Sequence, residues 1–105
     1  MKFLMWVCVD QALAGTAESD PTDWVTAAGP RRLEGERLAD VDSATTLRPR
    51  DGGGTFVSDG PFAETKEQIA GYDILECRDM AEAVELAASH PAAKFGAIEV
   101  RPVWQ

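Results

Sequence analysis

The sequence predicts an α+β sandwich, and three observations support this prediction. The predicted elements follow the order strand, helix, strand, hairpin, strand, helix, strand. An Asp-Gly turn separates two strand-like runs, and residues 79–89 combine helical periodicity with capping residues. Two β-α-β units split around a hairpin describe a ferredoxin-like sandwich, with an antiparallel or mixed sheet and helices on one face. The 105 residues are expected to form a single domain, 1–105.

The predicted sheet begins with residues 2–9 (KFLMWVCV), a continuous apolar run typical of a central strand covered on both faces. Residues 32–38 form a second strand, in which Gly35 marks a bulge or a close approach. Residues 71–77 and 97–103 complete the sheet, and the topology places the first strand between these two.

The inserted hairpin is predicted from two runs, residues 44–50 and 55–58, which flank Asp51-Gly52-Gly53-Gly54. Asp-Gly between strand-like runs is a strong hairpin signal, and the further glycines lengthen the turn. The Asp59-Gly60-Pro61-Phe62 segment that follows has turn chemistry, with Phe62 expected to anchor the turn in the core.

Two helices and a short helical turn are expected. Asp20-Pro21 begins a short helix that carries Trp24. Asp79 is the predicted N-cap of residues 79–89, and the helix ends before Pro91. Residues 64–68 (ETKEQ) are expected to form one helical turn.

Composition excludes several function classes. The chain has 18 acidic and 10 basic residues and a net charge of −8, which argues against nucleic acid and anionic membranes as partners. No apolar run approaches the length of a membrane span, and residues 3–9 are too short for a convincing signal peptide. We therefore expect a cytoplasmic protein.

No cofactor is expected, because the sequence has no phosphate loop, dinucleotide fingerprint or metal-ligand cluster. Cys8 and Cys77 fit no zinc signature and are expected to be reduced, buried thiols. They end strands that we expect to be parallel neighbours, so a redox pair is the alternative.

Residues 59–71 read DGPFAETKEQIAG, which resembles the signature of the DGPF, or YCII-related, family of small bacterial proteins. The similarity extends to residues 33–35, 44–48, 82–83, 90–93, 96 and 98–103. The resemblance implies a ferredoxin-like homodimer of the dimeric α/β-barrel type, whose two sheets face each other. Some relatives act on small, often aromatic-derived molecules. The catalytic His proposed for YCII-type proteins in the first helix has no counterpart here, so that site is not carried over.

Asp59 is the first candidate for chemistry. Its carboxylate caps the turn by accepting backbone N–H groups, or it acts as a base at the mouth of a pocket. His90 is the second candidate, because the single histidine either makes a helix-terminal hydrogen bond or shuttles protons near neutral pH. Lys66 and Glu67 lie in a charged cluster that is either solvated or faces the site.

Strand alternation predicts a polar group on the sheet face away from the helices. If Tyr72 and Ile74 pack on the helices, Asp73 points to the other face, as do Glu99 and Arg101 in the last strand. Enclosed in a dimer, these charges form salt bridges between subunits, or a pocket in which Arg101 holds a carboxylate.

Trp6 lies on the face of the first strand that the helices do not need to cover, where it suits a ligand pocket. Three functions remain open on this basis. They are a cofactor-free enzyme of lyase, isomerase or dehalogenase type, a ligand-binding or regulatory dimer without turnover, and a purely structural dimer.

Overall fold

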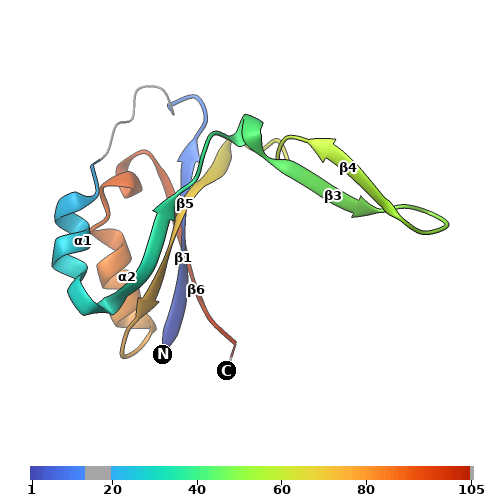
Figure 1. The fold of residues 1–105 in the computed structure, drawn as a ribbon. Coiled ribbons are helices and arrows are strands. Elements are labelled where there is room, and N and C mark those ends of the chain that lie inside the picture. The colour runs from blue at the N-terminus through green and yellow to red at the C-terminus, as the bar shows by residue number, and fades with distance from the viewer. Residues whose placement is uncertain (14–19, 105) are drawn as a thin grey trace.

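A computed structural model describes residues 1–13 and 20–104, and it contains a four-stranded antiparallel sheet with two helices on one face (Figure 1). The sheet order is β2-β5-β1-β6, formed by Arg32–Arg37, Glu67–Glu76, Lys2–Asp10 and Gly96–Pro102. Strand β1 therefore lies between β5 and β6, as the predicted topology requires. The α+β class, the inserted hairpin and the single covered face are confirmed.

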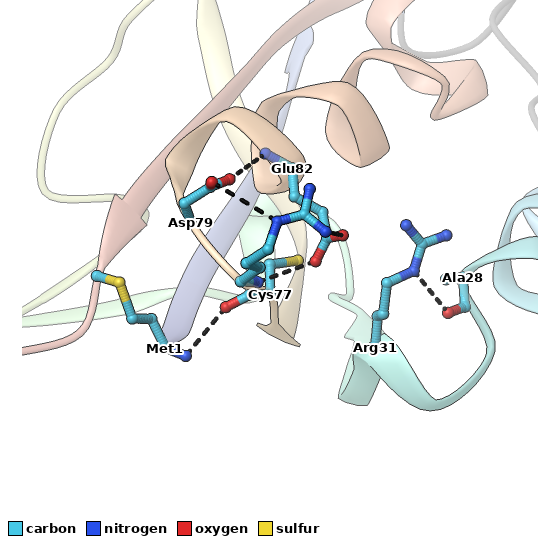
Figure 2. Close-up of polar contacts among 7 residues, drawn as sticks. Met1, Ala28, Arg31, Cys77, Asp79 and Glu82 are labelled. Atoms are coloured by element: carbon cyan, nitrogen blue, oxygen red, sulfur yellow. Dashed lines mark hydrogen bonds and ion pairs between the residues drawn. The ribbon is translucent and has the colours of Figure 1, made fainter.

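The two helices are α1 (Thr22–Ala28) and α2 (Met80–Ala88). Helix α2 starts at the predicted N-cap, since the Asp79 carboxylate accepts the Glu82 N–H at 2.9 Å. The Arg78 N–H in turn donates to the Glu82 carboxylate at 2.9 Å, so side chains accept two backbone N–H groups at the start of the helix (Figure 2). For α1, Asp20 accepts hydrogen bonds from the backbone and hydroxyl of Thr22.

Short 3₁₀ turns link these elements at Gly29–Arg31, Val41–Ser43 and Pro91–Lys94. Arg31 donates to the Ala28 carbonyl at 3.2 Å, close to where β2 begins (Figure 2). The N-terminal amino group donates to the Cys77 carbonyl at 3.0 Å, which holds the start of β1 beside the end of β5.

The core lies between the helices and the sheet. Phe3, Met5 and Leu75 are fully buried from the sheet side, and Ala83 is fully buried from α2. Trp24 of α1 is 5% exposed, and its indole N–H donates to the Leu86 carbonyl of α2 at 2.8 Å. This hydrogen bond ties the two helices together over the sheet, where a buried indole N–H needs an acceptor.

The hairpin forms a separate two-stranded sheet of β3 (Thr45–Pro49) and β4 (Thr55–Asp59). Figure 1 shows it extending from the body on the side opposite the helices. Three consecutive glycines at its tip, residues 52–54, have φ between 81° and 102°, a region that favours glycine. We call this hairpin the arm.

Three local expectations were wrong. Residues 64–68 form no helical turn, because β5 already begins at Glu67, and the Gln68 side chain donates to the Ala63 carbonyl at 2.7 Å. Phe62 does not anchor the core, since it is 76% exposed. Cys8 and Cys77 are not neighbours, because β1 and β5 run antiparallel and Cys8 pairs with Ile69 at the far end of β5.

Candidate functional site

The face of the sheet away from the helices, which we call the open face, is half-buried and mixed in character. Its members follow from strand alternation and register. The central ones are Leu4, Trp6, Cys8, Glu34, Glu36, Tyr72, Ile74, Glu99 and Arg101, and the pair Asp10 and Glu67 lies at one end. The side chains of Leu4, Trp6, Cys8, Tyr72 and Ile74 are of intermediate exposure, and helices α1 and α2 lie on the other face of the sheet (Figure 1). An apolar surface of this kind is typical of a binding surface.

Trp6 lies at the centre of the open face. It pairs with Tyr72 on β5 and with Glu99 on β6, so an indole ring stands between a phenol and a carboxylate. Leu4, two residues before Trp6 on β1, lies on the same face between Ile74 of β5 and Arg101 of β6. The open face therefore presents an aromatic and aliphatic floor flanked by charged groups, as small-molecule sites commonly do.

Glu99 and Arg101 are next to each other on β6, and the guanidinium donates to the Glu99 carboxylate. Both side chains are well exposed, at 48% and 68% respectively, so the ion pair contributes little to stability and remains available to a ligand. The structure thus brings together Trp6, Glu99 and Arg101 of the predicted site residues, and it places a fourth, Glu67, at the end of the same face.

Two further groups on the open face are weak acids held in their protonated form. Desolvation, followed by the Glu34 and Glu36 carboxylates, raises the pKa of Tyr72. Desolvation and the Glu67 and Glu99 carboxylates likewise raise the pKa of Cys8. At neutral pH, Tyr72 is therefore a hydrogen-bond donor, with the Glu34 side chain as its partner, and Cys8 is a thiol rather than a nucleophilic thiolate.

Asp73 was predicted to lie on the open face, and this prediction was wrong. It faces the helices together with Leu75, and it is 6% exposed. The carboxylate can be buried there because Arg32 of β2 donates to it from Nε at 2.7 Å. The apolar neighbours Tyr72 and Ile74, which sequence reasoning assigned to the core, lie instead on the open face.

Burial is the main cause of the unusual titration of Asp73. It raises the pKa of the carboxyl, although the hydrogen bond and charge of Arg32 and the charge of His90 oppose the rise. Sequence reasoning missed Arg32 as the partner, but it singled out Gly35, the residue whose missing side chain makes room for the pair.

His90 is buried between the helices and the sheet, on the side opposite the open face. Its Nδ1 accepts the Ala92 N–H at 3.0 Å, and its ring meets that of Trp24 edge-on at 4.8 Å. Burial lowers the pKa of His90, with a smaller opposing effect from Asp73. The neutral ring thus carries its proton on Nε2 and caps the turn at Pro91–Lys94. A role in proton transfer stays a prediction.

Asp59 is the last residue of β4, at the base of the arm. Among the residues that the structure describes, its carboxylate has no hydrogen bond or ion pair, so it does not cap the turn as expected. The turn is held instead by the Thr46 hydroxyl, which donates to the Gly60 carbonyl at 2.8 Å, and by the Gly60 N–H, which donates to the Ala44 carbonyl at 2.7 Å. The carboxylate remains free for another role.

Lys66 and Glu67 lie where β5 begins. The Lys66 ammonium is 3.4 Å from the Asp10 carboxylate, and Glu67 is paired with Asp10 across the two strands. The Lys66 side chain is 78% exposed, which corresponds to the solvated reading of this cluster. Whether either residue contacts a ligand stays a prediction.

Two shallow grooves lie away from the open face. One, of about 350 Å³, runs beside Trp24 and Ser89 and is bordered by Asp20 and Asp23. The other, of about 330 Å³, lies between α2 and β6 and is lined by Val84, Ile98 and other apolar side chains. In the described part of the chain, no group of three or more His, Cys, Asp or Glu side chains is arranged to hold a metal ion.

Comparison with known proteins agrees with the fold. Residues 11–105 match the family model of the YCII-related domain. An uncharacterised protein of Rhizobium meliloti is 44% identical over 69 residues, which cover 64% of this chain and 55% of that protein. The match therefore spans about half the length of that relative.

Among solved structures, the 5-chloro-2-hydroxyhydroquinone dehydrochlorinase of Burkholderia phenoliruptrix, in complex with 2,5-dihydroxybenzoquinone, has a similar fold. The TM-score is 0.53 at 15% identity, and the alignment covers 100% of this chain and 94% of that one. At this identity the likeness concerns the fold alone. Within the described residues, no helix is both long and apolar enough to cross a membrane.

Proposed function

The chain belongs to the YCII-related domain family, and from that premise we propose that it is a cofactor-free enzyme acting on a small, planar, hydroxylated ring. The proposed site is the open face, enclosed when a second copy covers it. The observation that carries the proposal is the position of Trp6, half-buried between Tyr72 and Glu99 on a face without helices.

The chemistry of the open face supports a ring-shaped ligand. The Trp6 indole offers a stacking surface, and the Tyr72 hydroxyl, which is hydrogen-bonded to the Glu34 side chain, donates to a ring oxygen when the ligand takes the place of that partner. Arg101 supplies a fixed positive charge for an ionised hydroxyl or carboxylate. The dehydrochlorinase that shares the fold is bound to a dihydroxybenzoquinone, which suggests hydroxylated rings as the first class to test.

The proposed reaction is an elimination of lyase or dehalogenase type. A base removes a proton from the ring or its hydroxyl, the freed electron pair forms a new double bond, and a leaving group departs as an anion. Such a step balances without an oxidant or a reductant. Asp59 is our candidate for the base, because its carboxylate is free and the arm extends on the same side as the open face.

We do not propose His90 as a residue that contacts the ligand. Its ring lies on the helix side of the sheet, and its Nδ1 lone pair is taken by the Ala92 N–H. To act as a base, it would have to give up that hydrogen bond.

A non-catalytic ligand-binding dimer is the second candidate function. The observation that favours it is that Tyr72 and Cys8, two of the proton-carrying groups of the open face, are held protonated near neutral pH. Such a face binds a ring through its aromatic floor, and Glu99, the carboxylate beside Trp6, is already paired with Arg101.

The test is a thermal-shift titration of the purified protein with chlorinated hydroquinones and 2,5-dihydroxybenzoquinone. A ligand that binds only the folded state raises Tm by mass action, and a shift is expected. Arg101→Ala is expected to remove the shift. Arg78→Ala, which truncates an arginine of similar exposure (74% against 68%) near the start of α2, is expected to retain it.

Chloride release from the chlorinated ring, followed in the same samples, separates the two candidate functions. A shift with chloride release supports the enzyme. A shift without release at any substrate concentration supports the binding dimer. A shift that Arg101→Ala and Arg78→Ala affect equally, or no shift at all, would overturn the open face as the binding site.

A further inference from the structure

We propose that the arm is exchanged between two copies of the chain, so that the β3–β4 hairpin of one copy lies on the open face of the other and forms a wall of its site. The inference rests on the dimer of the proposed function, and it adds which element of the second copy completes the site. It starts from the size and surface of the arm.

The arm is not packed against its own body. A compact domain of this length has a radius of gyration of about 13 Å, whereas this chain has 15.7 Å and a longest dimension of 48 Å. Figure 1 shows the arm standing clear of the four-stranded sheet. An isolated two-stranded hairpin is marginal in water. We therefore expect the hairpin to be stabilised by packing against another surface.

The arm exposes large apolar side chains that the described part of the chain leaves about half uncovered. Leu47 and Val57 are paired across the two strands and are 63% and 55% exposed. Phe56, on the other face of the hairpin, is 47% exposed, and Phe62 beyond the hairpin is 76% exposed. Three large apolar groups on so small an element, with a fourth just beyond it, are more than a solvated hairpin needs, which marks the arm as an interaction surface.

The position of the arm identifies the occupant as a second copy. The arm extends from the side of the sheet that carries the open face, so whatever covers that face also lies beside the arm (Figure 1). In a two-fold dimer the same patch meets itself, and each arm then reaches the other body. One geometry thereby covers both the open face and the arm.

Charge supports the same arrangement. Two copies of net charge −8 repel each other unless cations meet carboxylates at the contact. The arm carries Arg48 and Arg50, the latter placed 5.8 Å from the Phe56 ring. The open face carries Glu34 and Glu36 on the edge strand β2. We therefore expect the arm of one copy to lie along β2 and β5 of the other, beside Tyr72.

Photo-cross-linking tests the exchange directly. Phe56 is replaced by p-benzoylphenylalanine, and ¹⁵N-labelled and unlabelled protein are mixed, dissociated and reassociated before irradiation. The expected cross-links join a labelled to an unlabelled peptide and end in residues 32–37 or 67–76. Cross-links confined to single copies would overturn the proposal.

Matched variants provide a second measurement. Val57→Asp on the arm is expected to weaken dimerisation at least tenfold in sedimentation experiments. Val84→Asp on α2, at a valine of similar exposure (50% against 55%) on the helix side, is expected to leave it unchanged. Circular dichroism confirms that both variants fold. Equal dimer affinity for the two variants would overturn the proposal.

These results are distinguishable from those that test the proposed function. Cross-links between copies, together with no Tm shift by any of the ring compounds, would support the arm exchange and contradict the proposed enzyme. A ligand shift that depends on Arg101, with cross-links only within copies, supports the open-face site and removes the arm exchange.

Discussion

Gly35 leaves the space that the Asp73 carboxylate occupies. A Cβ at residue 35 would lie 2.0 Å from Asp73 Oδ1 and 2.7 Å from the guanidinium of Arg32, far inside van der Waals contact. The Gly35 carbonyl also accepts a hydrogen bond from Arg32 at 2.8 Å. Residues from two neighbouring strands thus form one buried polar unit, and the glycine is required by space rather than by its backbone angles.

Gly35→Ala is expected to destabilise the fold strongly. The added methyl group must displace the Asp73 carboxylate or the Arg32 side chain, which breaks a largely buried ion pair. A loss of about 3 kcal/mol in the free energy of unfolding is expected, as for other disrupted buried pairs. Urea unfolding monitored by tryptophan fluorescence measures it.

Gly53→Ala is the control for this substitution. At the tip of the arm, a Cβ meets nothing within 4 Å, but φ is 102°. Its cost should be confined to backbone strain, about 1–2 kcal/mol. If the two substitutions destabilise the protein equally, the space argument for Gly35 is wrong.

His90 should make the protein less stable as the pH falls below neutrality. Burial lowers its pKa in the folded state below the usual value of about 6.5. The unfolded chain therefore binds a proton that the folded chain does not. The stabilising contribution is complete above about pH 6.5 and is lost as the pH falls towards the folded pKa, with a slope of at most about 1.4 kcal/mol per pH unit.

His90→Asn is expected to flatten this loss, because asparagine can still accept the Ala92 N–H but does not titrate. Asp73 has the opposite sign, since its raised pKa favours the folded state at low pH. The comparison is therefore made in an Asp73→Asn background, by chemical unfolding from pH 5 to pH 8. An unchanged slope in His90→Asn would show that His90 does not cause the pH dependence.

The hairpin and the long helix could be predicted because their signals are local. The Asp51–Gly54 turn identifies the arm, and the spacing of Asp79 and Glu82 identifies the start of α2. Each signal depends on residues a few positions apart, so neither requires knowledge of distant contacts.

The face of Asp73 could not be predicted for the opposite reason. Its burial depends on Arg32, which is 41 residues away in the chain, and on the gap at Gly35. Alternation alone assigned Tyr72 and Ile74 to the core because they are more apolar than their neighbours. The prediction that Cys8 and Cys77 are close was wrong because β1 and β5 are antiparallel, and the apolar pattern of two buried strands does not indicate their relative direction.

Asp59→Asn separates a structural from a chemical role for the residue at the base of the arm. Among the described residues, the carboxylate has no partner, so the free energy of unfolding should change by less than about 0.5 kcal/mol. Under the proposed function, the same substitution removes the base and should abolish chloride release while the Tm shift by the ring ligand persists. Thermal unfolding and halide release measure the two effects on one sample.

Thr46→Val is the matched change in the same turn. It keeps the β-branched shape but removes the hydroxyl that donates to the Gly60 carbonyl, which should cost about 1 kcal/mol. The predicted pattern is thus a stability loss at Thr46 without one at Asp59, and a turnover loss at Asp59. A drop of several degrees in Tm for Asp59→Asn would show that the carboxylate holds the turn after all, because no exposed and unpaired group produces such a loss.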